Sequence, residues 1–187
     1  IYIPELSSKD IENYLMLLVA QQYISADRFS DFIQGIKAKK LMISEDLIDL
    51  TKLNELTEGF IHEDVEEEYG ETAAVIAGTK NIVAGNLKGN PRQTKRFLNT
   101  FTTKRKLAEL YYGKGTINHR ILAKLLVLQK LDNDLFIQLH EWNKRFTTEN
   151  EEFKAMRLNV TSDGETDEKY NNWRIPSIVS WLKSEPV

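Results

Sequence analysis

The sequence predicts an all-α protein built as a multi-helix bundle. Apolar residues recur three and four positions apart in one segment after another, which is the spacing of a helix with one buried face. Residues that cap or stop helices stand at the ends of these segments. No run of β-branched residues alternates with polar ones, so no strand is expected. At 187 residues and 41% hydrophobic content, the chain is long enough to bury a core.

The first part of the chain is expected to be an extended segment over residues 1–6, followed by helices over residues 7–57. Ser7 or Ser8 can cap the first helix, because a hydroxyl accepts from the free N–H groups of a first turn. Ser44-Glu45-Asp46 is expected to cap a third helix carrying Leu47, Ile48 and Leu50. The apolar positions that predict the first two helices are Ile11, Tyr14, Leu15, Leu18, Phe29, Phe32, Ile33 and Ile36.

The middle of the chain begins with residues 58–70, an acidic and weakly periodic stretch that is expected to be a connector, either a loop or a short helix. Residues 71–158 are expected to form a basic helical bundle. Its first helix runs from about Glu71 to Ala84, and a turn follows over residues 86–89. The longest helix is predicted from Pro91 to about Tyr112, where Gly113-Lys114-Gly115 stops it.

Further along, Thr116 is predicted to cap a strongly apolar helix, and Asp132-Asn133 to start another. The polar residues 159–172 are expected to form a mobile loop. A short terminal helix is expected within residues 173–187.

Composition excludes several classes of protein. The chain has no cysteine, which excludes disulfides, a thiolate nucleophile and cysteine-ligated metal sites. The longest apolar run, Leu15 to Ala20, is far shorter than the roughly 20 residues that span a bilayer. These features favour a cytoplasmic protein. Because the chain begins at Ile1 without an initiator methionine, we expect further sequence upstream.

Charge is distributed unevenly along the chain, although the net charge is only −3. Residues 45–71 hold eleven acidic residues against one basic residue, Lys52, whereas residues 72–130 hold twelve basic residues against one acidic residue, Glu109. Such asymmetry favours either internal pairing of the two stretches or an anionic ligand on the basic one.

The segment from Gly89 to Asn99 is the most informative one. Asn90 is a favoured N-cap and Pro91 suits the first helical position, so a helix is expected to begin here with free backbone N–H groups in its first turn. Arg92, Lys95 and Arg96 then lie on one face near the positive end of the helix dipole, where cations are unfavourable unless an anion offsets them. A phosphate suits this arrangement. The alternative is that the acidic stretch folds over this face and neutralises it.

Gly89-Asn90-Pro91-Arg92, continuing as Lys95-Arg96-Phe97-Leu98-Asn99, resembles the Asn-Pro-Arg segment of the KAP family of P-loop NTPases and the sensor-2 helix of AAA-type ATPases. Two weaker likenesses flank it: residues 2–15 resemble the stretch that leaves the last core strand of KAP proteins, and residues 181–186 resemble a tryptophan-containing segment near the end of that family's domain.

The resemblance implies that the chain is the helical lid that follows an α/β nucleotide-binding core. Arg92 then takes the position of the sensor-2 arginine, which contacts the γ-phosphate, and Asn90, Lys95 and Arg96 accompany it as nucleotide-binding residues. ATP and Mg²⁺ are expected with the core, and no metal site or cofactor is expected in this chain alone. Some KAP family members resemble phage-exclusion factors, and others have transmembrane segments outside this region, so the whole protein could be membrane-associated.

A Walker A loop is missing from the sequence: the single Gly-Lys pair, Gly113-Lys114, lacks the required glycine at position 108. The chain alone is therefore not expected to hydrolyse ATP, and its first partner is expected to be a P-loop core in the same polypeptide. The alternative function is a non-enzymatic helical adaptor that binds an acidic protein or a nucleic acid through its basic helix.

The remaining candidates have simpler interpretations. Lys104-Arg105-Lys106 is interpreted as a solvated part of the long helix, with a nucleic-acid patch as the alternative. His62, His119 and His140 lack the spacing of metal ligands. Asn159-Val160-Thr161 matches a glycosylation sequon, but we expect it to be unused in a cytoplasmic protein.

Overall fold

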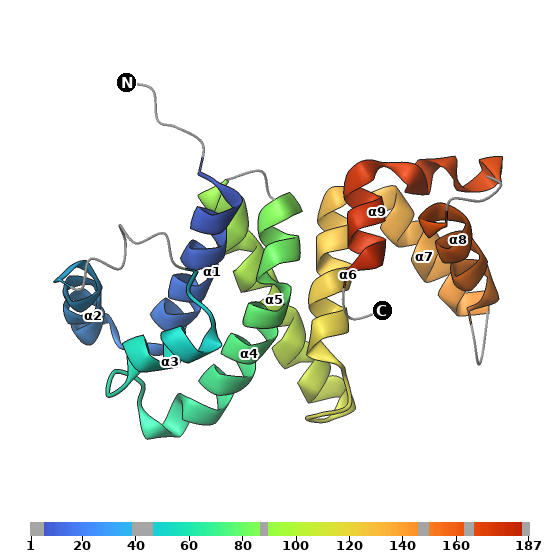
Figure 1. The fold of residues 1–187 in the computed structure, drawn as a ribbon. Helices are drawn as coiled ribbons and strands as arrows, with labels where there is room; N and C mark the ends of the chain where they lie inside the picture. Colours follow the sequence, from blue (N-terminus) through green and yellow to red (C-terminus); the bar gives the residue numbers. More distant parts are fainter. Residues whose placement is uncertain (1–5, 39–46, 87–89, 146–149, 163–166, 185–187) are drawn as a thin grey trace. The chain divides into compact units, whose positions relative to one another are not determined.

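The computed structural model describes residues 6–38, 47–86, 90–145, 150–162 and 167–184 (Figure 1). These ranges contain no strand, so the predicted all-α class is confirmed. They also contain no helix with the length and apolar composition needed to cross a membrane. The helices are α1 (Ser8–Tyr23), α2 (Ala26–Ala38), α3 (Leu50–Thr57), α4 (Glu63–Asn86), α5 (Pro91–Tyr112), α6 (His119–Leu131), α7 (Asn133–Arg145), α8 (Glu151–Thr161), the 3-10 helix η1 (Glu168–Arg174) and α9 (Pro176–Lys183).

The chain divides into two compact units, residues 1–120 and residues 121–187. This division differs from the one that the sequence predicted, in which a basic bundle begins at residue 71. Residue 71 lies inside α4, and the second unit begins shortly after the start of α6. A boundary drawn from the change in charge therefore does not coincide with the boundary drawn from packing.

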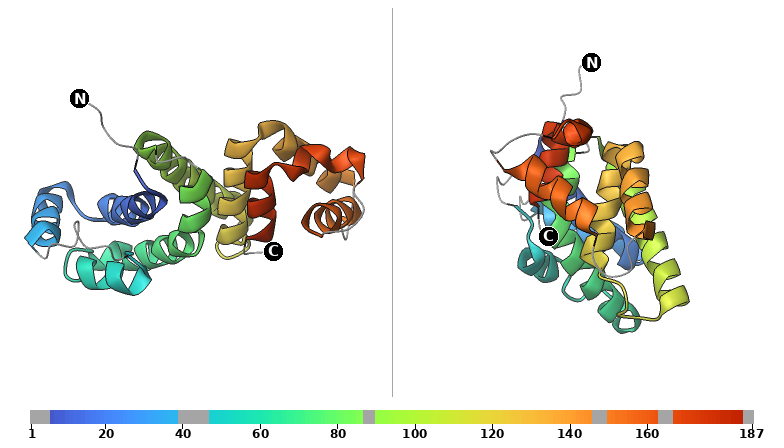
Figure 2. Two further views of the ribbon diagram at one scale, coloured as in Figure 1. Left: turned by 45° about the horizontal axis from the view of Figure 1, so that its top comes forward. Right: turned by 90° about the vertical axis from the view of Figure 1, so that its right-hand side faces the viewer.

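Helix α1 forms the centre of the first unit and packs against α4 and α5 (Figures 1 and 2). Its start is fixed locally, as predicted: the Ser7 hydroxyl accepts from the Asp10 N–H at 3.1 Å, and the Asp10 carboxylate accepts from the Ser7 N–H at 2.9 Å. Ile11, Leu15 and Val19 are completely buried on the face that these contacts orient.

Helix α3 begins later than the sequence predicted. Its N-cap is Asp49, whose carboxylate accepts from the Lys52 N–H at 2.8 Å, and Ser44-Glu45-Asp46 lies outside the described residues. Ile48 precedes the helix instead of lying within it. Side chains from α1 and α4 form hydrogen bonds with the backbone of Ile48. Asn13 accepts from the Ile48 N–H at 2.7 Å, and Lys80 donates to the Ile48 carbonyl at 2.7 Å.

The prediction of a separate connector over residues 58–70, a loop or a short helix, was wrong for its second half, because residues 63–70 belong to the one continuous helix α4 from Glu63 to Asn86. Acidic residues fill its first turn, where the positive end of the helix dipole stabilises them. Tyr69 is 5% exposed, and its hydroxyl lies 2.8 Å from the Thr57 hydroxyl. Burial of Tyr69 against α3 thus anchors a segment whose sequence alone is weakly periodic.

Helix α5 matches its predicted bounds, and Gly113 ends it in a conformation with a φ of 89° that favours glycine. The predicted role of Thr116 was wrong. Its hydroxyl donates to the Tyr112 carbonyl at 2.8 Å and so belongs to the end of α5, whereas the Asn118 side chain accepts from the Arg120 N–H at the start of α6. The predicted turn after α4 lies mostly outside the described residues.

The second unit packs α8, η1 and α9 together, with α7 against α8. Its core includes Trp173 and Trp181, which are 0% and 2% exposed. Asp132 caps α7 as predicted, accepting from the Asp134 and Leu135 N–H groups at 3.0 Å. The predicted mobile loop over residues 159–172 was wrong where the structure describes it: residues 159–161 complete α8 and residues 168–172 belong to η1, while 163–166 lie outside the described residues.

Candidate functional site

The first turn of α5 holds the four residues that the sequence singled out. Asn90 is its N-cap, and the Asn90 side-chain oxygen accepts from the backbone N–H groups of Arg92 at 3.1 Å and Gln93 at 3.2 Å. The Thr94 N–H donates to the Asn90 carbonyl at 3.1 Å, and Pro91 has no N–H. The expectation of free backbone N–H donors in this turn was therefore wrong. An anion at this turn would be bound by the side chains.

The cations of this turn lie on its solvent side. Arg92, Lys95 and Arg96 are exposed, and none of them forms an ion pair with any residue in the described ranges. Their spacing of three and four positions places them on one face of α5. The opposite face is anchored in the core by Thr94, Phe97, Leu98 and Phe101, which are at most 1% exposed. The structure thus brings the predicted residues together on a helix start held in place by packing.

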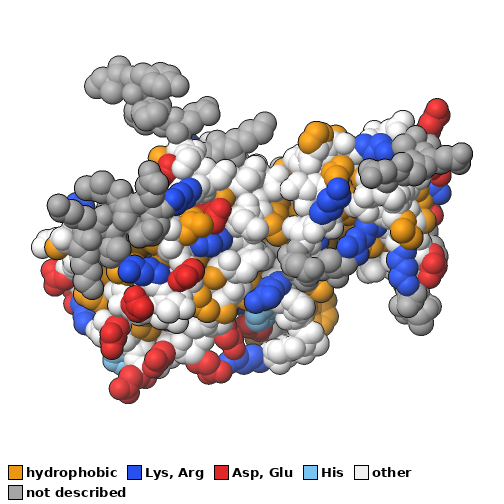
Figure 3. Space-filling view, viewed as in Figure 1, with side chains coloured by type: hydrophobic (Ala, Val, Ile, Leu, Met, Phe, Trp, Pro, Cys, Tyr) orange, Lys and Arg blue, Asp and Glu red, His pale blue; other side chains and the backbone are white. Residues whose placement is uncertain are grey.

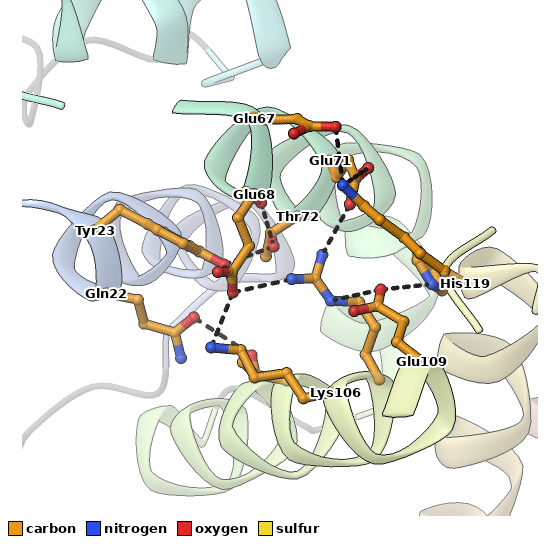
Figure 4. Close-up of polar contacts among 12 residues, drawn as sticks. Gln22, Tyr23, Glu67, Glu68, Glu71, Thr72, Lys106, Glu109 and His119 are labelled. Carbon is orange, nitrogen blue, oxygen red and sulfur yellow. Dashed lines mark hydrogen bonds and ion pairs between the residues drawn. The ribbon is translucent and has the colours of Figure 1, made fainter. Parts of the chain in front are cut away.

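The acidic stretch does not neutralise this face through the contacts that the structure describes. Glu67 lies 2.8 Å from Lys114, and Glu68 lies 3.0 Å from Lys106 (Figure 4). Glu71 is 3.6 Å from Lys114. These carboxylates on α4 therefore pair with the far end of α5 and the turn after it. Other acidic side chains gather over α3 and the start of α4, at the lower left of Figure 3.

Arg105 lies at the centre of this acidic cluster, although the sequence predicted a solvated position for it. Its side chain is 1% exposed, with Nη2 3.2 Å from Glu68, Nη1 4.0 Å from Glu71 and Nε 3.8 Å from Glu109. The missed signal is its spacing: residue 105 follows Phe97 and Phe101 at intervals of four, on the buried face of α5. A buried charge needs partners, and three carboxylates surround this one.

Polar contacts extend the cluster at both ends. His119 Nε2 lies 3.1 Å from the Glu109 carboxylate, and the Tyr23 hydroxyl donates to Glu68 at 3.2 Å (Figure 4). Among the buried atoms, Nε and Nη1 of Arg105 and Nε2 of His119 have no partner with hydrogen-bond geometry. The two Arg105 nitrogens are stabilised by the charges of the nearby carboxylates.

The ion pairs shift the pKa values of two carboxyl groups and one ammonium group in the cluster. Burial raises the pKa of Glu68, but the hydrogen bond and charge of Lys106 and the charge of Arg105 outweigh it, and the pKa of this carboxyl is lowered. The hydrogen bond from Lys114 lowers the pKa of Glu67, and the same bond raises the pKa of the Lys114 ammonium. All three shifts favour the charged forms, so Glu67, Glu68 and Lys114 form ion pairs at neutral pH.

The histidines do not form a site together. His62 contacts Asp64 at 3.1 Å on the surface, His119 contacts Glu109, and His140 lies in the second unit. Within the described ranges, no group of three or more histidine, cysteine, aspartate or glutamate side chains is arranged to hold a metal ion.

Comparison of this chain with protein-family models, with curated proteins and with solved structures finds no match. Its function is therefore argued from the geometry of its own residues.

Proposed function

We propose that this chain is the helical lid of a P-loop NTPase similar to the KAP family, and that the first turn of α5 contacts the phosphates of a nucleotide bound by the core. The observation that carries the proposal is that Arg92, Lys95 and Arg96 share one exposed face and form no ion pair with a described residue, while the α4 carboxylates Glu67 and Glu68 pair with cations farther along the chain. Three cations at the positive end of a helix are unfavourable by themselves, and an anionic ligand reverses this.

The donor set fits a phosphate through its side chains. Arginine presents a planar fork of N–H donors that matches phosphate oxygens, and lysine adds a mobile point charge. Asn90 accepts from the first-turn N–H groups, so it holds the turn in shape and contributes no donor from the backbone. In this proposal Arg92 is the sensor arginine, and Lys95 and Arg96 raise the local positive potential.

ATP with Mg²⁺ would supply the bond that is hydrolysed, and the P-loop core would bind both. The residues of this chain would hold positive charge beside the terminal phosphate. The buried face of α5 packs against α1 and α4, so a displacement of Arg92 on nucleotide binding would move α5 against these two helices. This movement is how the lid would couple nucleotide state to a partner protein.

The test is steady-state ATP hydrolysis by the polypeptide that joins this chain to its P-loop core. Arg92→Ala should lower kcat by about 10²-fold, because removing one preorganised positive donor typically costs that much. Lys37→Ala, at an exposed position on α2, is the matched control and should leave kcat unchanged. An unchanged rate in Arg92→Ala, or a reading frame around this chain that encodes no Gly-x-x-x-x-Gly-Lys-Ser/Thr motif, would overturn the proposal.

A further inference from the structure

The second unit contains a cavity of about 410 Å³ bordered by α6, α7, α8 and α9, the helices drawn from yellow to red in Figure 1. This volume is within the range of small-molecule sites. Ten described residues line the cavity, whereas a stable protein interface uses about 20 to 30 residues on each side. The cavity therefore suits a small molecule better than a protein partner. Six of the lining side chains are apolar: Ile121, Leu125, Phe136, Leu139, Phe153 and Trp181.

The protein's own side chains cover the apolar wall of the cavity incompletely. Leu125, Phe136, Leu139 and Phe153 all line it, and all four remain partly exposed. A molecule that fills the cavity would remove this apolar surface from water, and that burial favours binding.

Aromatic rings make up half of the apolar wall. They come from three helices, with Phe136 on α7, Phe153 on α8 and Trp181 on α9. Elsewhere in the same unit, Trp142 stacks on Trp173 with 5.6 Å between the ring centroids, and neither is among the described residues that line the cavity. A ligand ring in the cavity can make edge-to-face or offset contacts with the wall, which add to the gain from burial.

Three polar groups of the wall bond to the protein itself. The Lys124 ammonium donates to the Ser184 carbonyl at 2.6 Å and lies 5.0 Å from the centroid of the Trp181 ring. The Trp181 indole N–H donates to the Lys124 carbonyl at 2.7 Å. The Asn150 side chain accepts from the Phe153 N–H at 2.9 Å. Since these groups already serve the fold, a charged ligand would lose its hydration here without gaining a dedicated partner, and the wall favours a neutral one.

We propose that this cavity binds a small neutral aromatic molecule. Its rings lie against Phe136, Phe153 and Trp181, and a hydroxyl group on it can bond to the exposed side chains of His140 or Asn143, which also line the cavity. The proposal uses only residues of the second unit and is independent of the phosphate-binding role proposed for α5.

The first experiment is isothermal titration calorimetry of the whole chain with 2-naphthol and, in competition with it, with 2-naphthoate, which has the same rings and a negative charge. 2-Naphthol should bind to one saturable site, and 2-naphthoate should compete for this site with an affinity at least tenfold lower. Absence of saturable 2-naphthol binding up to about 1 mM, the weakest affinity worth assigning to a site, would overturn the proposal. Equal or tighter binding of 2-naphthoate at the same site would overturn the assignment of a neutral ligand.

A third probe tests the aromatic character of the ligand. Decahydro-2-naphthol has the carbon skeleton and the hydroxyl group of 2-naphthol without its aromatic rings. 2-Naphthol should bind about three- to tenfold more tightly, because aromatic pairs add to the gain from burial. Phe153→Leu removes one ring and keeps the wall apolar, so it should remove most of this preference. Equal affinities of the wild type for the two alcohols would overturn the assignment of an aromatic ligand.

The second experiment places a bulky group in the cavity wall. Ile121 lines the cavity and is 45% exposed, so Ile121→Trp should lower 2-naphthol affinity at least tenfold without unfolding the chain. Leu158→Trp is the matched control, because Leu158 is 70% exposed on α8 and is not among the described residues that line the cavity. Equal affinities in the two variants would place 2-naphthol elsewhere and overturn the proposal.

If Phe153→Leu does not fold, as judged by circular dichroism, the three probes and the variants at Ile121 and Leu158 still decide the matter. A dimer in sedimentation that Ile121→Trp dissociates, without 2-naphthol binding, would overturn the proposal and show that this face pairs two copies of the chain.

Discussion

The guanidinium of Arg105 on α5 and the carboxylate of Glu68 on α4 form an ion pair with an Nη2 to Oε1 distance of 3.2 Å. The two residues are 37 positions apart in the sequence, so the pair fixes one helix against the other. Arg105 is almost completely buried, whereas the Glu68 side chain is 37% exposed. The arginine therefore depends on the pair more than the glutamate does.

Replacing Arg105 by Met is expected to lower the free energy of unfolding by about 3 kcal/mol, because it leaves three carboxylates close together without their central cation. The measurement is urea unfolding followed by circular dichroism. Lys95→Met is the control, since Lys95 is exposed on the same helix, and it should change stability by less than about 0.5 kcal/mol. A loss of similar size in both variants would show that the cluster does not depend on Arg105.

Glu68 should make stability depend on pH in the acidic range. Its pKa is lowered in the folded chain, so its stabilising contribution is complete above its unfolded pKa and is lost as the pH falls through the lower, folded pKa. Below about pH 4.5, the free energy of unfolding of the wild type should therefore decrease more steeply than that of Glu68→Gln. Glu66→Gln, at an exposed neighbouring position, should retain the steep decrease of the wild type. Parallel curves for all three proteins would contradict this prediction.

Substitutions at Asn90 allow the stability of α5 to be tested separately from its proposed affinity for anions. Asn90→Ala removes the N-cap and should cost about 1 kcal/mol of unfolding free energy. Asn90→Asp keeps a cap and adds a negative charge that suits the helix dipole, so stability should be retained.

The same Asn90→Asp substitution should weaken binding of inorganic tripolyphosphate severalfold, because the new carboxylate lies beside the cations of the first turn. NMR chemical-shift titration of the Arg92 and Gln93 amides at low salt measures this. Replacing Arg92, Lys95 and Arg96 together by Ala gives the reference for lost binding. Unchanged tripolyphosphate affinity in Asn90→Asp would argue against phosphate contact at this turn.

Replacing glycine by alanine is expected to change stability in opposite directions at two positions. Gly113 has a φ of 89°, so Gly113→Ala should destabilise the end of α5 by about 1 kcal/mol. Gly35 lies within α2 with open space around it, and Gly35→Ala should raise stability by about 0.5 to 1 kcal/mol. Thermal unfolding of the two variants checks the signs, and a stabilising Gly113→Ala would show that the positive φ at residue 113 is not required.

The local features of the fold could be predicted from the sequence because they depend on residues within four positions of each other. Ser7, Asn90 and Asp132 cap their helices as expected, and Gly113 ends α5 where glycine is favoured. The candidate site is of the same kind, since the spacing of Arg92, Lys95 and Arg96 within one helix places them on one face.

The start of α4 and the partners of the charged residues could not be predicted in this way. Residues 63–70 form a helix because Tyr69 packs against α3 and because Glu67 and Glu68 find cations on α5 and beyond it. These contacts join segments that only the packed chain brings together.

The sequence by itself determined the all-α class, the starts of α1, α5 and α7 and the cationic face of α5, since caps and periodicity act within a turn or two of helix. Only the tertiary structure decided that the acidic stretch pairs with Lys106, Lys114 and a buried Arg105 and leaves Arg92 exposed. The physical reason is that a charge pairs with whichever opposite charge the packing of apolar faces brings within a few ångströms, and the net charge of a segment does not specify that choice.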